Sequence, residues 1–255
     1  MSRRDAGVKV DYDAIAHRYD VFRKGAGPYL PVMVALAKAH GARRILEVGA
    51  GTGNNTLPFH SACPEASLFT CDLSWGMIAR AREKRVPGGW LQADAHFLPF
   101  ATRSLDFCFG CFVLHYISDL EAFCHECARV LRKGCVAFST ASHHFIERHP
   151  MNRYFPSFAA VDKARFPTIE AVKNALRDAG FHNVSEKRIK APAKPIDGDY
   201  LQRVENHFIS TYTLLPKDEF EAGLVRLRED IKAKGQLDVE LAWESVAIWG
   251  EKALP

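Results

Sequence analysis

Short apolar runs recur along the chain, and several of them end in a polar or charged residue. Runs of this length are typical of parallel strands that are buried on both faces. The first run contains Ile45, Leu46 and Val48, with Glu47 as the charged residue inside it. We expect strands at residues 45–48, 68–72, 90–94, 104–114, 135–140, 181–189 and 241–252.

Segments with apolar residues at helical spacing lie between these strands. Ser74 and either Ser118 or Asp119 are suitable N-cap residues, while Gly41 and Gly180 are suitable helix ends. The alternation of strands and helices predicts an α/β domain. We expect a short amphipathic helix or helical turn within residues 11–24, and helices at residues 29–40, 54–63, 75–85, 119–131, 168–180 and 217–233.

The glycine-rich turn after the first strand is the most informative motif. Gly49, Gly51 and Gly53 occupy alternate positions, and Glu47 comes two positions before the first of them. Dinucleotide-binding folds use a related G-x-G-x-x-G turn for a pyrophosphate, which a carboxylate at this position would repel. S-adenosylmethionine carries an ammonium group and no phosphate, so Glu47 suits it better. An ordinary strand–helix turn without a ligand is the simpler alternative.

Polar side chains at the ends of the next three strands also indicate a ligand site. Asp72 lies 19 positions after Gly53, about where a carboxylate can bind both hydroxyls of a ribose. Asp94 follows the third strand, where it could accept a hydrogen bond from an adenine amino group. His115 and Tyr116 follow the fourth strand. Because ligands of open α/β sheets bind at the carboxyl ends of the strands, we expect these groups at one site.

These motifs, in this order, resemble the class I S-adenosylmethionine-dependent methyltransferases, in particular the small-molecule type 11 group. The resemblance runs from about residue 10 to residue 185. Lys133-Gly134-Cys135 departs from the Pro-Gly-Gly that the family usually has before the fifth strand, and we expect this to affect only a turn. The matching motifs are Glu47-Val-Gly-Ala-Gly-Thr-Gly53, Asp72-Leu-Ser-Trp-Gly-Met77, Asp94-Ala95, Leu114-His115 and Ala128-Arg-Val-Leu-Arg-Lys-Gly134.

The resemblance implies a Rossmann-like, doubly wound and mostly parallel seven-stranded sheet with an antiparallel edge strand. It also implies an N-terminal lid helix and a helical insertion before the last strand. We therefore expect N-terminal lid helices at 1–40, a cofactor-binding core at 41–191, a helical substrate cap at 192–239 and the final core strand at 240–255. We call residues 11–24 the N-terminal segment and residues 192–239 the cap.

S-adenosylmethionine is the cofactor that the resemblance implies. Glu47 and the glycines would surround its methionine part, and Asp72 would hold the ribose. Met77 would lie beside the adenine, and Asp94 would bind the adenine amino group. The complete set of expected cofactor-binding residues is Tyr19, Arg23, Glu47, Gly49, Ala50, Gly51, Gly53, Asp72, Leu73, Met77, Asp94, Ala95, Cys111 and Phe112.

Two members of this set, Tyr19 and Arg23, come from the N-terminal segment, which folds over the cofactor in the resembled family. They are candidates for contacting the methionine end of the cofactor or the substrate. Ile15, Tyr19 and Phe22 also lie at helical spacing, so simple packing of an N-terminal helix is an equally good alternative.

Composition and charge narrow the classes of function. The chain has 255 residues, of which 47% are hydrophobic and 25% charged, and its net charge is +4. No run of consecutive Lys or Arg indicates a nucleic-acid interface. No apolar run approaches the length of a membrane span, and the N-terminus lacks the apolar core of a signal peptide, so we expect a cytoplasmic protein. The sequence does not predict the oligomeric state.

Seven cysteines include two C-x-x-C pairs, a spacing that zinc sites use. Cys108 and Cys111 lie three residues apart on a predicted strand, so they point to opposite faces. Cys124 and Cys127 lie on one face of a predicted helix, where Cys behaves as a small apolar residue. We therefore expect buried free thiols, as in a reducing compartment, and no metal site.

We expect a methyltransferase that acts on a small, partly apolar molecule, with the acceptor selected by the long connections 141–166 and 192–235. Methyl transfer needs orientation and desolvation, and it needs a base only where the acceptor must lose a proton. His115 is the first candidate for this base, and His143 and His144 are second choices; a structural histidine is the simpler alternative for each. Candidate substrate-binding residues are Tyr116, Tyr154, Arg203, His207 and Tyr212.

Three rival functions stay open. A nicotinamide-dependent oxidoreductase is disfavoured by Glu47 and by the spacing of the third glycine. An RNA methyltransferase would bind nucleic acid with an affinity that depends on salt. A protein that binds the cofactor without catalysis, and works as an interaction partner, would keep Glu47, Asp72 and Asp94 but show no turnover.

Overall fold

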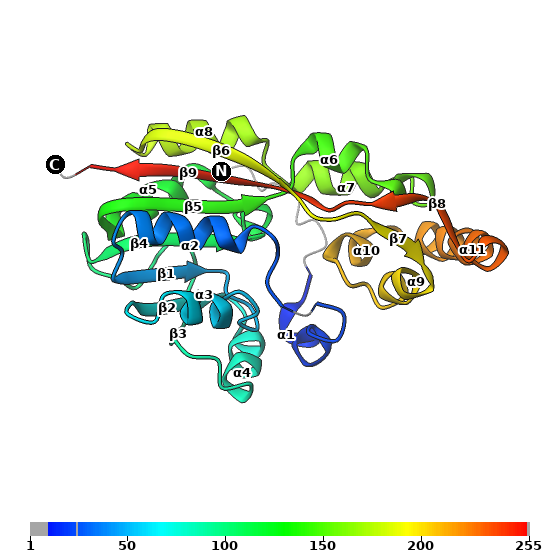
Figure 1. Ribbon diagram of the computed structural model, residues 1–255, viewed down its shortest axis with the longest axis horizontal. Coiled ribbons are helices and arrows are strands. Elements are labelled where there is room, and N and C mark those ends of the chain that lie inside the picture. Colours follow the sequence, from blue (N-terminus) through cyan, green and yellow to red (C-terminus); the bar gives the residue numbers. More distant parts are fainter. Residues whose placement is uncertain (1–9, 24, 254–255) are drawn as a thin grey trace, which may run out of the picture.

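A computed structural model describes residues 10–23 and 25–253; residues 1–9 of the expected N-terminal part lie outside the described residues. The described residues form nine strands: β1 (Arg44–Val48), β2 (Ser67–Asp72), β3 (Gly89–Gln92), β4 (Leu105–Cys111), β5 (Leu131–Thr140), β6 (His182–Lys190), β7 (Lys194–Asp197), β8 (Gln236–Leu241) and β9 (Glu244–Lys252). Seven of them form one sheet in the order β3-β2-β1-β4-β5-β9-β6 (Figure 1).

The sheet confirms the predicted mostly parallel, seven-stranded α/β fold. β9 is antiparallel to both of its neighbours, and the other neighbouring pairs are parallel. The antiparallel strand lies one place inside the edge, because β6 is the outermost strand. β6, at the edge, is itself antiparallel to β9, so this edge of the sheet has the expected antiparallel pairing.

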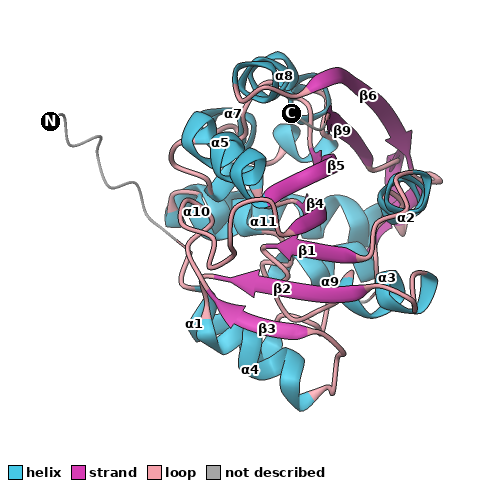
Figure 2. Cartoon of the chain, turned by 90° about the vertical axis from the view of Figure 1, so that its left-hand side faces the viewer, coloured by secondary structure: helices cyan, strands magenta, loops and turns pink. Residues whose placement is uncertain are grey.

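Helices cover both faces of the sheet (Figure 2). α2 (Leu30–Ala39) and α3 (Thr56–Ala62) pack on one face, where Phe59 shares an apolar cluster with Phe107 and Phe109 of β4. α5 (Leu120–Val130) and α8 (Ile169–Asp178) pack on the other face, and α4 (Trp75–Glu83) packs along β2 and β3. All seven residues of β4 are buried, as its apolar sequence predicts.

The helix starts confirm two of the predicted caps. Ser74 Oγ accepts a hydrogen bond from the backbone N of Met77 over 3.1 Å at the start of α4. Asp119, and not Ser118, caps α5 by accepting from the backbone N of Ala122 over 2.9 Å. Such caps satisfy backbone donors that have no partner within the helix.

The order of the strands reverses at β1, which pairs with β2 on one side and with β4 on the other. These strands and β3 are mutually parallel, so their carboxyl ends lie along one edge of the sheet. In doubly wound folds, ligands bind in the crevice at such a reversal. The fold therefore places the ends of β1, β2, β3 and β4 where the sequence predicts the ligand site.

The cap forms its own cluster beside the sheet (Figure 1). Its elements are β7, α9 (Gly198–Glu205), α10 (Ser210–Leu214), α11 (Lys217–Lys234) and β8. β7 and β8 pair as a second, antiparallel sheet, which the sequence analysis did not predict. The expected strand at 241–252 is wrong at its start, because Leu241 ends β8 and β9 begins at Glu244.

The connection after β5 contains α6 (His143–Glu147), a 3-10 turn η3 (Pro150–Arg153) and α7 (Phe158–Arg165). Three of its aromatic side chains, Tyr154, Phe155 and Phe158, pack against the cap in the same cluster as Leu227 of α11. The two segments expected to select the acceptor therefore share one apolar core.

The N-terminal segment is helical only near its start, in agreement with the expected short helix or helical turn. It contains α1 (Tyr12–Ile15) and a 3-10 turn η1 (Ala16–Arg18), and residues 19–23 are not helical. The Asp20 side chain is instead hydrogen-bonded to Thr52 in the glycine turn and to Lys84. These tertiary contacts replace the hydrogen bonds that a continued helix would make.

The cysteines are reduced in this structure, and six of the seven are buried. Cys108 and Cys111 belong to apolar clusters on opposite faces of the sheet, and Cys124 and Cys127 belong to a single cluster, as predicted. Within residues 10–23 and 25–253, no group of His, Cys, Asp or Glu has the arrangement of a metal site. Among the helices of the same ranges, none has both the length and the apolar composition of a membrane span.

Lys133 and Gly134 lie inside β5, so the expected turn at this position is wrong. Gly134 has φ of 123°, and a Cβ atom there would lie 1.9 Å from the backbone oxygen of Asp106 in β4. Glycine is required because the neighbouring strand approaches where a side chain would begin.

We predict that Gly134→Ala lowers the free energy of unfolding by about 2–4 kcal/mol, from backbone strain and overpacking together. Urea unfolding followed by circular dichroism measures this change. Gly180→Ala is the matched control, because φ there is also positive, at 86°, but no atom lies within 4 Å of the added Cβ. We expect the control to cost only about 1 kcal/mol. Equal losses in the two variants would contradict the close approach.

Candidate active site

The carboxylate of Asp72 joins the two turns that the sequence predicts around one ligand. Its Oδ2 accepts from the backbone N of Gly51 over 2.8 Å, and its Oδ1 accepts from the backbone N of Ser74 over 2.9 Å. Asp72 ends β2, whereas Gly51 follows β1. Burial raises the pKa of Asp72, although these backbone donors oppose the shift. The carboxylate is therefore held at the strand reversal in a fixed orientation.

Glu47 is a fully buried carboxylate at the end of β1. Its Oε2 accepts from the Thr56 hydroxyl over 2.6 Å, while its Oε1 is buried and has no hydrogen-bond partner in the described part of the chain. Burial raises the pKa of Glu47 to about 8, with a smaller increase from the charge of Asp72. A buried acceptor without a donor is costly. It fits a ligand that brings a donor, such as an ammonium group.

In the glycine turn, the space beside Gly51 is empty, whereas the space beside Gly49 is filled by a neighbouring side chain. Gly51 has φ of 56°, and a Cβ atom there would meet no atom within 4 Å. A Cβ at Gly49 would lie 2.4 Å from Val113 Cγ2, so this glycine permits packing against the loop after β4. The free Glu47 oxygen, the open turn and the Asp72 carboxylate together fit the ammonium group and ribose of S-adenosylmethionine.

Asp94 lies two residues after β3, with its carboxylate exposed to solvent. Its Oδ1 accepts from the backbone N of His96 over 2.9 Å and lies 2.6 Å from His96 Nδ1. The His96 backbone donor is the main cause that lowers the pKa of Asp94. The exposed side chains of Leu73 and Phe97, 71% and 79% accessible, add apolar surface that an adenine ring could cover.

Other expected cofactor-binding residues are buried beneath the site. Ala50, Met77 and Cys111 are buried. Phe112 has φ of 54°, a conformation that is uncommon for a non-glycine residue, and its ring lies 5.5 Å from the ring of Tyr29. Strained backbone of this kind gathers at functional sites. It supports a functional role for the end of β4.

The N-terminal segment is anchored to both ligand-binding turns. Asp13 Oδ1 accepts from the Ser74 hydroxyl over 2.8 Å at the start of α4. Asp20 accepts from the Thr52 hydroxyl over 2.5 Å and from Lys84 Nζ over 2.8 Å. The segment therefore covers the glycine turn, which the sequence analysis predicted only from the resemblance.

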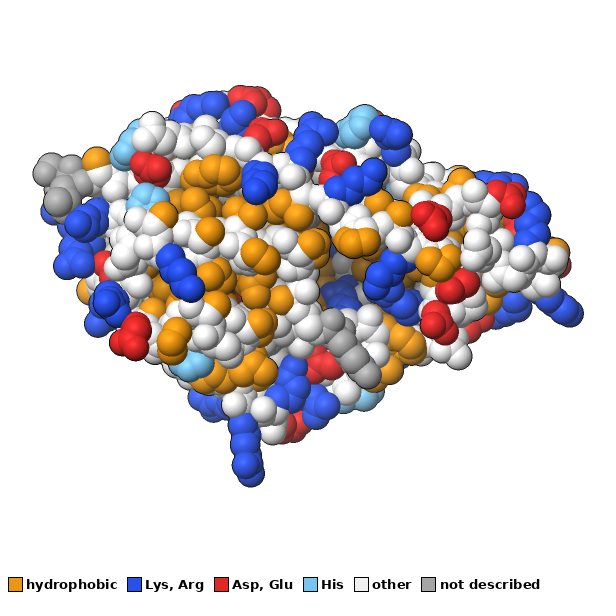
Figure 3. Space-filling model, viewed as in Figure 1, with side chains coloured by type: hydrophobic (Ala, Val, Ile, Leu, Met, Phe, Trp, Pro, Cys, Tyr) orange, Lys and Arg blue, Asp and Glu red, His pale blue; other side chains and the backbone are white. Residues whose placement is uncertain are grey.

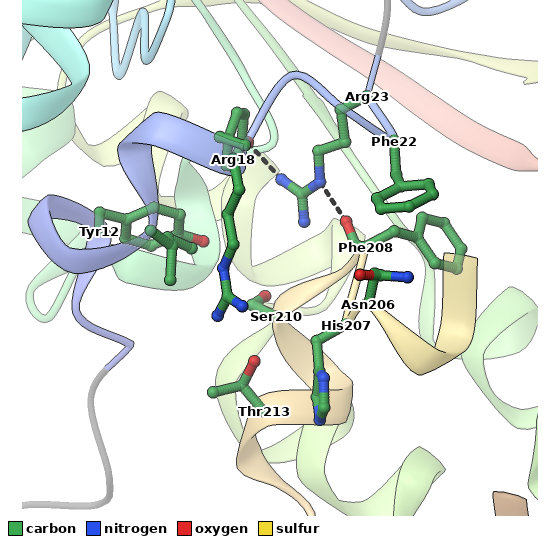
Figure 4. A pocket seen from close by; sticks show the side chains of 11 residues that line it. Tyr12, Arg18, Phe22, Arg23, Asn206, His207, Phe208, Ser210 and Thr213 are labelled. Carbon is green, nitrogen blue, oxygen red and sulfur yellow. Dashed lines mark hydrogen bonds between the residues drawn. The ribbon is translucent and has the colours of Figure 1, made fainter. Parts of the chain in front are cut away.

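The same segment also contacts the cap (Figure 4). Arg23 donates one hydrogen bond to the Tyr19 hydroxyl and another to the carbonyl oxygen of Phe208, at the junction of α9 and α10. The Tyr12 hydroxyl contacts the Tyr116 hydroxyl after β4. Residues from the sheet edge, the N-terminal segment and the cap are thus brought together, with Tyr19 and Arg23 between them.

His115 lies in a short 3-10 turn, η2 (Leu114–Tyr116), directly after β4. Its ring stacks on Phe166 at 4.1 Å, and its Nδ1 is buried with no hydrogen-bond partner among the described residues. Burial, followed by the positive charges of Arg165 and Arg23, lowers the pKa of His115 well below its usual range. The ring is therefore neutral at physiological pH and keeps one ring nitrogen free.

The other candidate histidines are placed differently. His143 Nε2 lies 2.8 Å from the carbonyl oxygen of Phe166, so a hydrogen bond holds it beside the residue that His115 stacks on. His144 is exposed, and its Nε2 accepts from Arg148 over 3.1 Å. His143, but not His144, therefore contacts Phe166, the residue on which His115 stacks.

The candidate substrate-binding residues fall into two groups, those near the cavity and those buried inside the cap. Tyr116 donates to the Ser210 hydroxyl over 2.9 Å, and His207 lines a cavity between the N-terminal segment and the cap. Arg203 lies over the ring of Phe208, 4.2 Å from its centroid. Tyr154 and Tyr212, in contrast, are buried in the apolar cluster of the cap, and the Tyr154 hydroxyl donates to Asp230 over 2.6 Å. The structure places these two tyrosines in packing positions.

Several residues of the site were missed by the sequence analysis. Thr56 is separated from Glu47 by nine positions, and His96 from Asp119 by 23, so only the fold brings them together. The alternation of Asp and Tyr in residues 11–20 was the available signal for the anchors of the N-terminal segment. The missed residues are Tyr12, Asp13, Asp20, Tyr29, Thr56, His96, Asp162 and Arg165.

Comparisons with known proteins agree with this geometry. Residues 46–139 match a family model described as a methyltransferase domain. Over 209 residues the chain is 27% identical to the ubiquinone/menaquinone biosynthesis C-methyltransferase UbiE of Desulfotalea psychrophila, covering 71% of this chain and 85% of that protein. It is 34% identical over 129 residues to the malonyl-[acyl-carrier protein] O-methyltransferase of Hahella chejuensis, which covers 50% of this chain and 46% of the relative.

A solved structure extends the likeness of the fold to most of the chain. A protein of Anabaena variabilis, provisionally assigned as a methyltransferase of an antibiotic biosynthesis pathway, superposes with a TM-score of 0.64. The match covers 87% of this chain and 96% of the other, at 21% sequence identity. The sheet and its helices are therefore shared beyond residues 46–139.

The buried carboxylate of Glu47 leads to a prediction about stability and pH. Because its pKa is raised from 4.5 to about 8 in the folded protein, the unfolded chain ionises first as pH rises. The contribution of Glu47 to the free energy of unfolding is therefore largest below pH 4.5. It falls as pH rises towards 8, by about 1.4 kcal/mol for each unit of the pKa difference. We expect Glu47→Gln to remove this dependence in urea unfolding at pH 5, 6.5 and 8, without added ligand.

Glu240→Gln, at an exposed position of β8, is the control and should leave the dependence intact. A parallel decline with pH in Glu47→Gln and the unmodified protein would show that Glu47 does not carry the effect.

Proposed function

Because the chain belongs to the class I S-adenosylmethionine-dependent methyltransferases, we propose that it transfers a methyl group to a small, partly apolar molecule. The observation that supports a small acceptor is the roof over the site. The N-terminal segment and the cap meet above the ends of the strands and leave between them a cavity of about 30 Å³. A duplex or a folded RNA would not reach the sheet edge without displacing this roof.

The relatives support the same class of acceptor. UbiE is named for ubiquinone and menaquinone biosynthesis, and the second relative for a malonyl group on an acyl carrier protein. The chain spans 85% of the first relative but only 46% of the second. Since carbon methylation and oxygen methylation both occur among relatives, the acceptor atom is set by the cap and not by the shared domain.

Glu47 and Asp72 would hold the cofactor. Glu47 Oε1 is free to accept from the ammonium group, and the Asp72 carboxylate lies where the ribose hydroxyls are expected. Asp94 and the exposed Leu73 would bind the adenine. When bound, S-adenosylmethionine supplies an electrophilic methyl group, and the chain has to orient the acceptor and exclude water.

His115 would contact the acceptor. Its stacking on Phe166 fixes the ring, and its neutral state leaves a nitrogen that can accept a hydrogen bond or a proton. A strongly lowered pKa makes it a weak base, so we assign it first to orienting the acceptor. It removes a proton only where the acceptor becomes acidic during transfer. His143, held by the carbonyl oxygen of Phe166, fixes the same wall of the site.

We propose further that the connection 141–166 and the cap select the acceptor. Phe166 of the connection stacks on His115, and Ser210 of the cap is hydrogen-bonded to Tyr116. Arg165 of the first segment donates to the Ser210 hydroxyl of the second over 2.8 Å. The seven free thiols support a reducing, cytoplasmic setting for the reaction.

A thermal-shift titration tests the cofactor. S-adenosylhomocysteine and S-adenosylmethionine should each raise the melting temperature by mass action, whereas NAD and NADP should not. Asp72→Asn should weaken S-adenosylhomocysteine binding by about tenfold or more, since it removes a charged hydrogen-bond acceptor. Asp178→Asn, at an exposed position of α8, is the control. Stabilisation by NAD or NADP alone would contradict the assignment.

Replacement of His115 tests the acceptor side. On an acceptor found by screening small molecules with labelled S-adenosylmethionine, we expect His115→Ala to lower kcat/KM by about 100-fold. Affinity for S-adenosylhomocysteine should not change. Because the pKa of His115 is lowered, its neutral form persists as pH falls through 6.5, and activity should show no inflection from this group there. His125→Ala, on the exposed side of α5, should retain full activity. Full activity of His115→Ala would remove His115 from the site.

A further inference from the structure

The cavity between the N-terminal segment and the cap has a positively charged lining (Figure 4). Arg18 and Arg23 line it from the N-terminal segment, and His207, Asn206 and Ser210 line it from the cap. No Asp or Glu is among its lining residues within the described chain. In the space-filling view, Lys and Arg side chains gather at the hollow between the sheet and the cap (Figure 3).

In the part of the chain that the structure describes, the two arginines have no ion-pair partner. Among the ion pairs of residues 10–23 and 25–253, none involves Arg18 or Arg23. Acidic groups of these and neighbouring elements are paired with other cations. Asp20 of the N-terminal segment lies 2.8 Å from Lys84, Glu205 of α9 lies 2.7 Å from Arg228, and Asp162 of α7 lies 2.7 Å from Arg165. Like charges held together without an acid create a positive potential that attracts anions.

Arg23 keeps donors free for a ligand. It is half-buried, and it donates from Nε to the Phe208 carbonyl oxygen and from Nη1 to the Tyr19 hydroxyl. A guanidinium group has five N–H donors, so three are left after these two bonds. A charged group that is partly removed from water, and has neither a counter-ion nor its full set of acceptors, is costly. An anion in the cavity would remove this cost.

The rest of the lining matches the non-charged part of such a ligand. Hydroxyl groups of Ser210 and Thr213 can donate to anionic oxygens, while Ile15 and Phe22 provide an apolar wall. The cavity adjoins the reaction centre, because Ser210 is hydrogen-bonded to Tyr116, the neighbour of His115. Its volume of about 30 Å³ accommodates a small polar group, since one water needs about 10–15 Å³.

We propose that this cavity binds an anionic oxygen group of the methyl acceptor, a carboxylate or a phosphate, through Arg18 and Arg23. The acceptor is then an amphiphilic anion whose charged end lies under the N-terminal segment and whose reacting end faces His115. Planar guanidinium groups bind both anions in bidentate fashion. The inference rests on the proposed function, since it names the substrate class of the same enzyme.

Isothermal titration of the protein saturated with S-adenosylhomocysteine tests the proposal. The probes are octanoate, octyl phosphate and octanamide, which share an apolar chain and differ in the head group. We expect at least one anion to bind about tenfold or more tightly than octanamide. Arg18→Gln and Arg23→Gln should each lower the affinity for that anion by about tenfold and leave the affinity for octanamide unchanged. Arg177→Gln, exposed on α8, is the matched control and should change nothing.

The outcomes distinguish a carboxylate from a phosphate, and a failure of the anion site from a failure of the proposed function. Tighter octanoate identifies a carboxylate, and tighter octyl phosphate a phosphate. Equal affinities for charged and neutral probes, or binding of none, would overturn the inference. So would a loss of S-adenosylhomocysteine affinity as large as the loss of anion affinity, because the arginines would then belong to the cofactor site. Failure of S-adenosylhomocysteine itself to bind would instead contradict the proposed function, and titrating the anions without it still tests the cavity.

Discussion

The burial of one carboxylate, Glu47, is the constraint on which the site depends. An acidic side chain fully removed from water is costly unless its oxygens are satisfied, and here the Thr56 hydroxyl satisfies only one of them. Burial raises the pKa of Glu47 to about 8, so its carboxyl group is mostly neutral near pH 7 unless a positively charged ligand stabilises the ionised form. Glu47 Oε1 is left without a hydrogen-bond donor in the described part of the chain, and a cationic ligand can supply that donor.

The same edge of the sheet shows how two turns become one site. Asp72 accepts backbone hydrogen bonds from Gly51 and from Ser74, so its carboxylate fixes the glycine turn relative to the start of α4. Any ligand between the two turns then meets a preformed surface. Preorganisation of this kind reduces the entropy that binding must overcome.

The N-terminal segment connects this cofactor surface to the acceptor side. Asp13 and Asp20 fasten it to the two turns, while Arg23 reaches the cap at Phe208. The segment therefore contacts both halves of the site, and its position depends on both. Because the connection after β5 and the cap share one apolar core, a change of side chains in that core would alter the shape of the acceptor site without touching the cofactor residues.

The sequence by itself determined the local elements and the type of ligand. Strand periodicity, the glycine turn, Ser74 and Asp119 as caps, and the carboxylates at 47, 72 and 94 are properties of neighbouring residues, which is why they could be predicted. The sheet of β7 and β8, and the contact of Asp20 with Thr52 in the glycine turn, depend on segments far apart in the chain. Tertiary packing alone decided that Tyr154 and Tyr212 are buried, and that Arg18, Arg23 and His207 share one cavity. A sequence pattern shows which face of a helix or strand is apolar. It does not show which other element covers that face, because this depends on tertiary packing, and the shape of the acceptor site depends on the same packing.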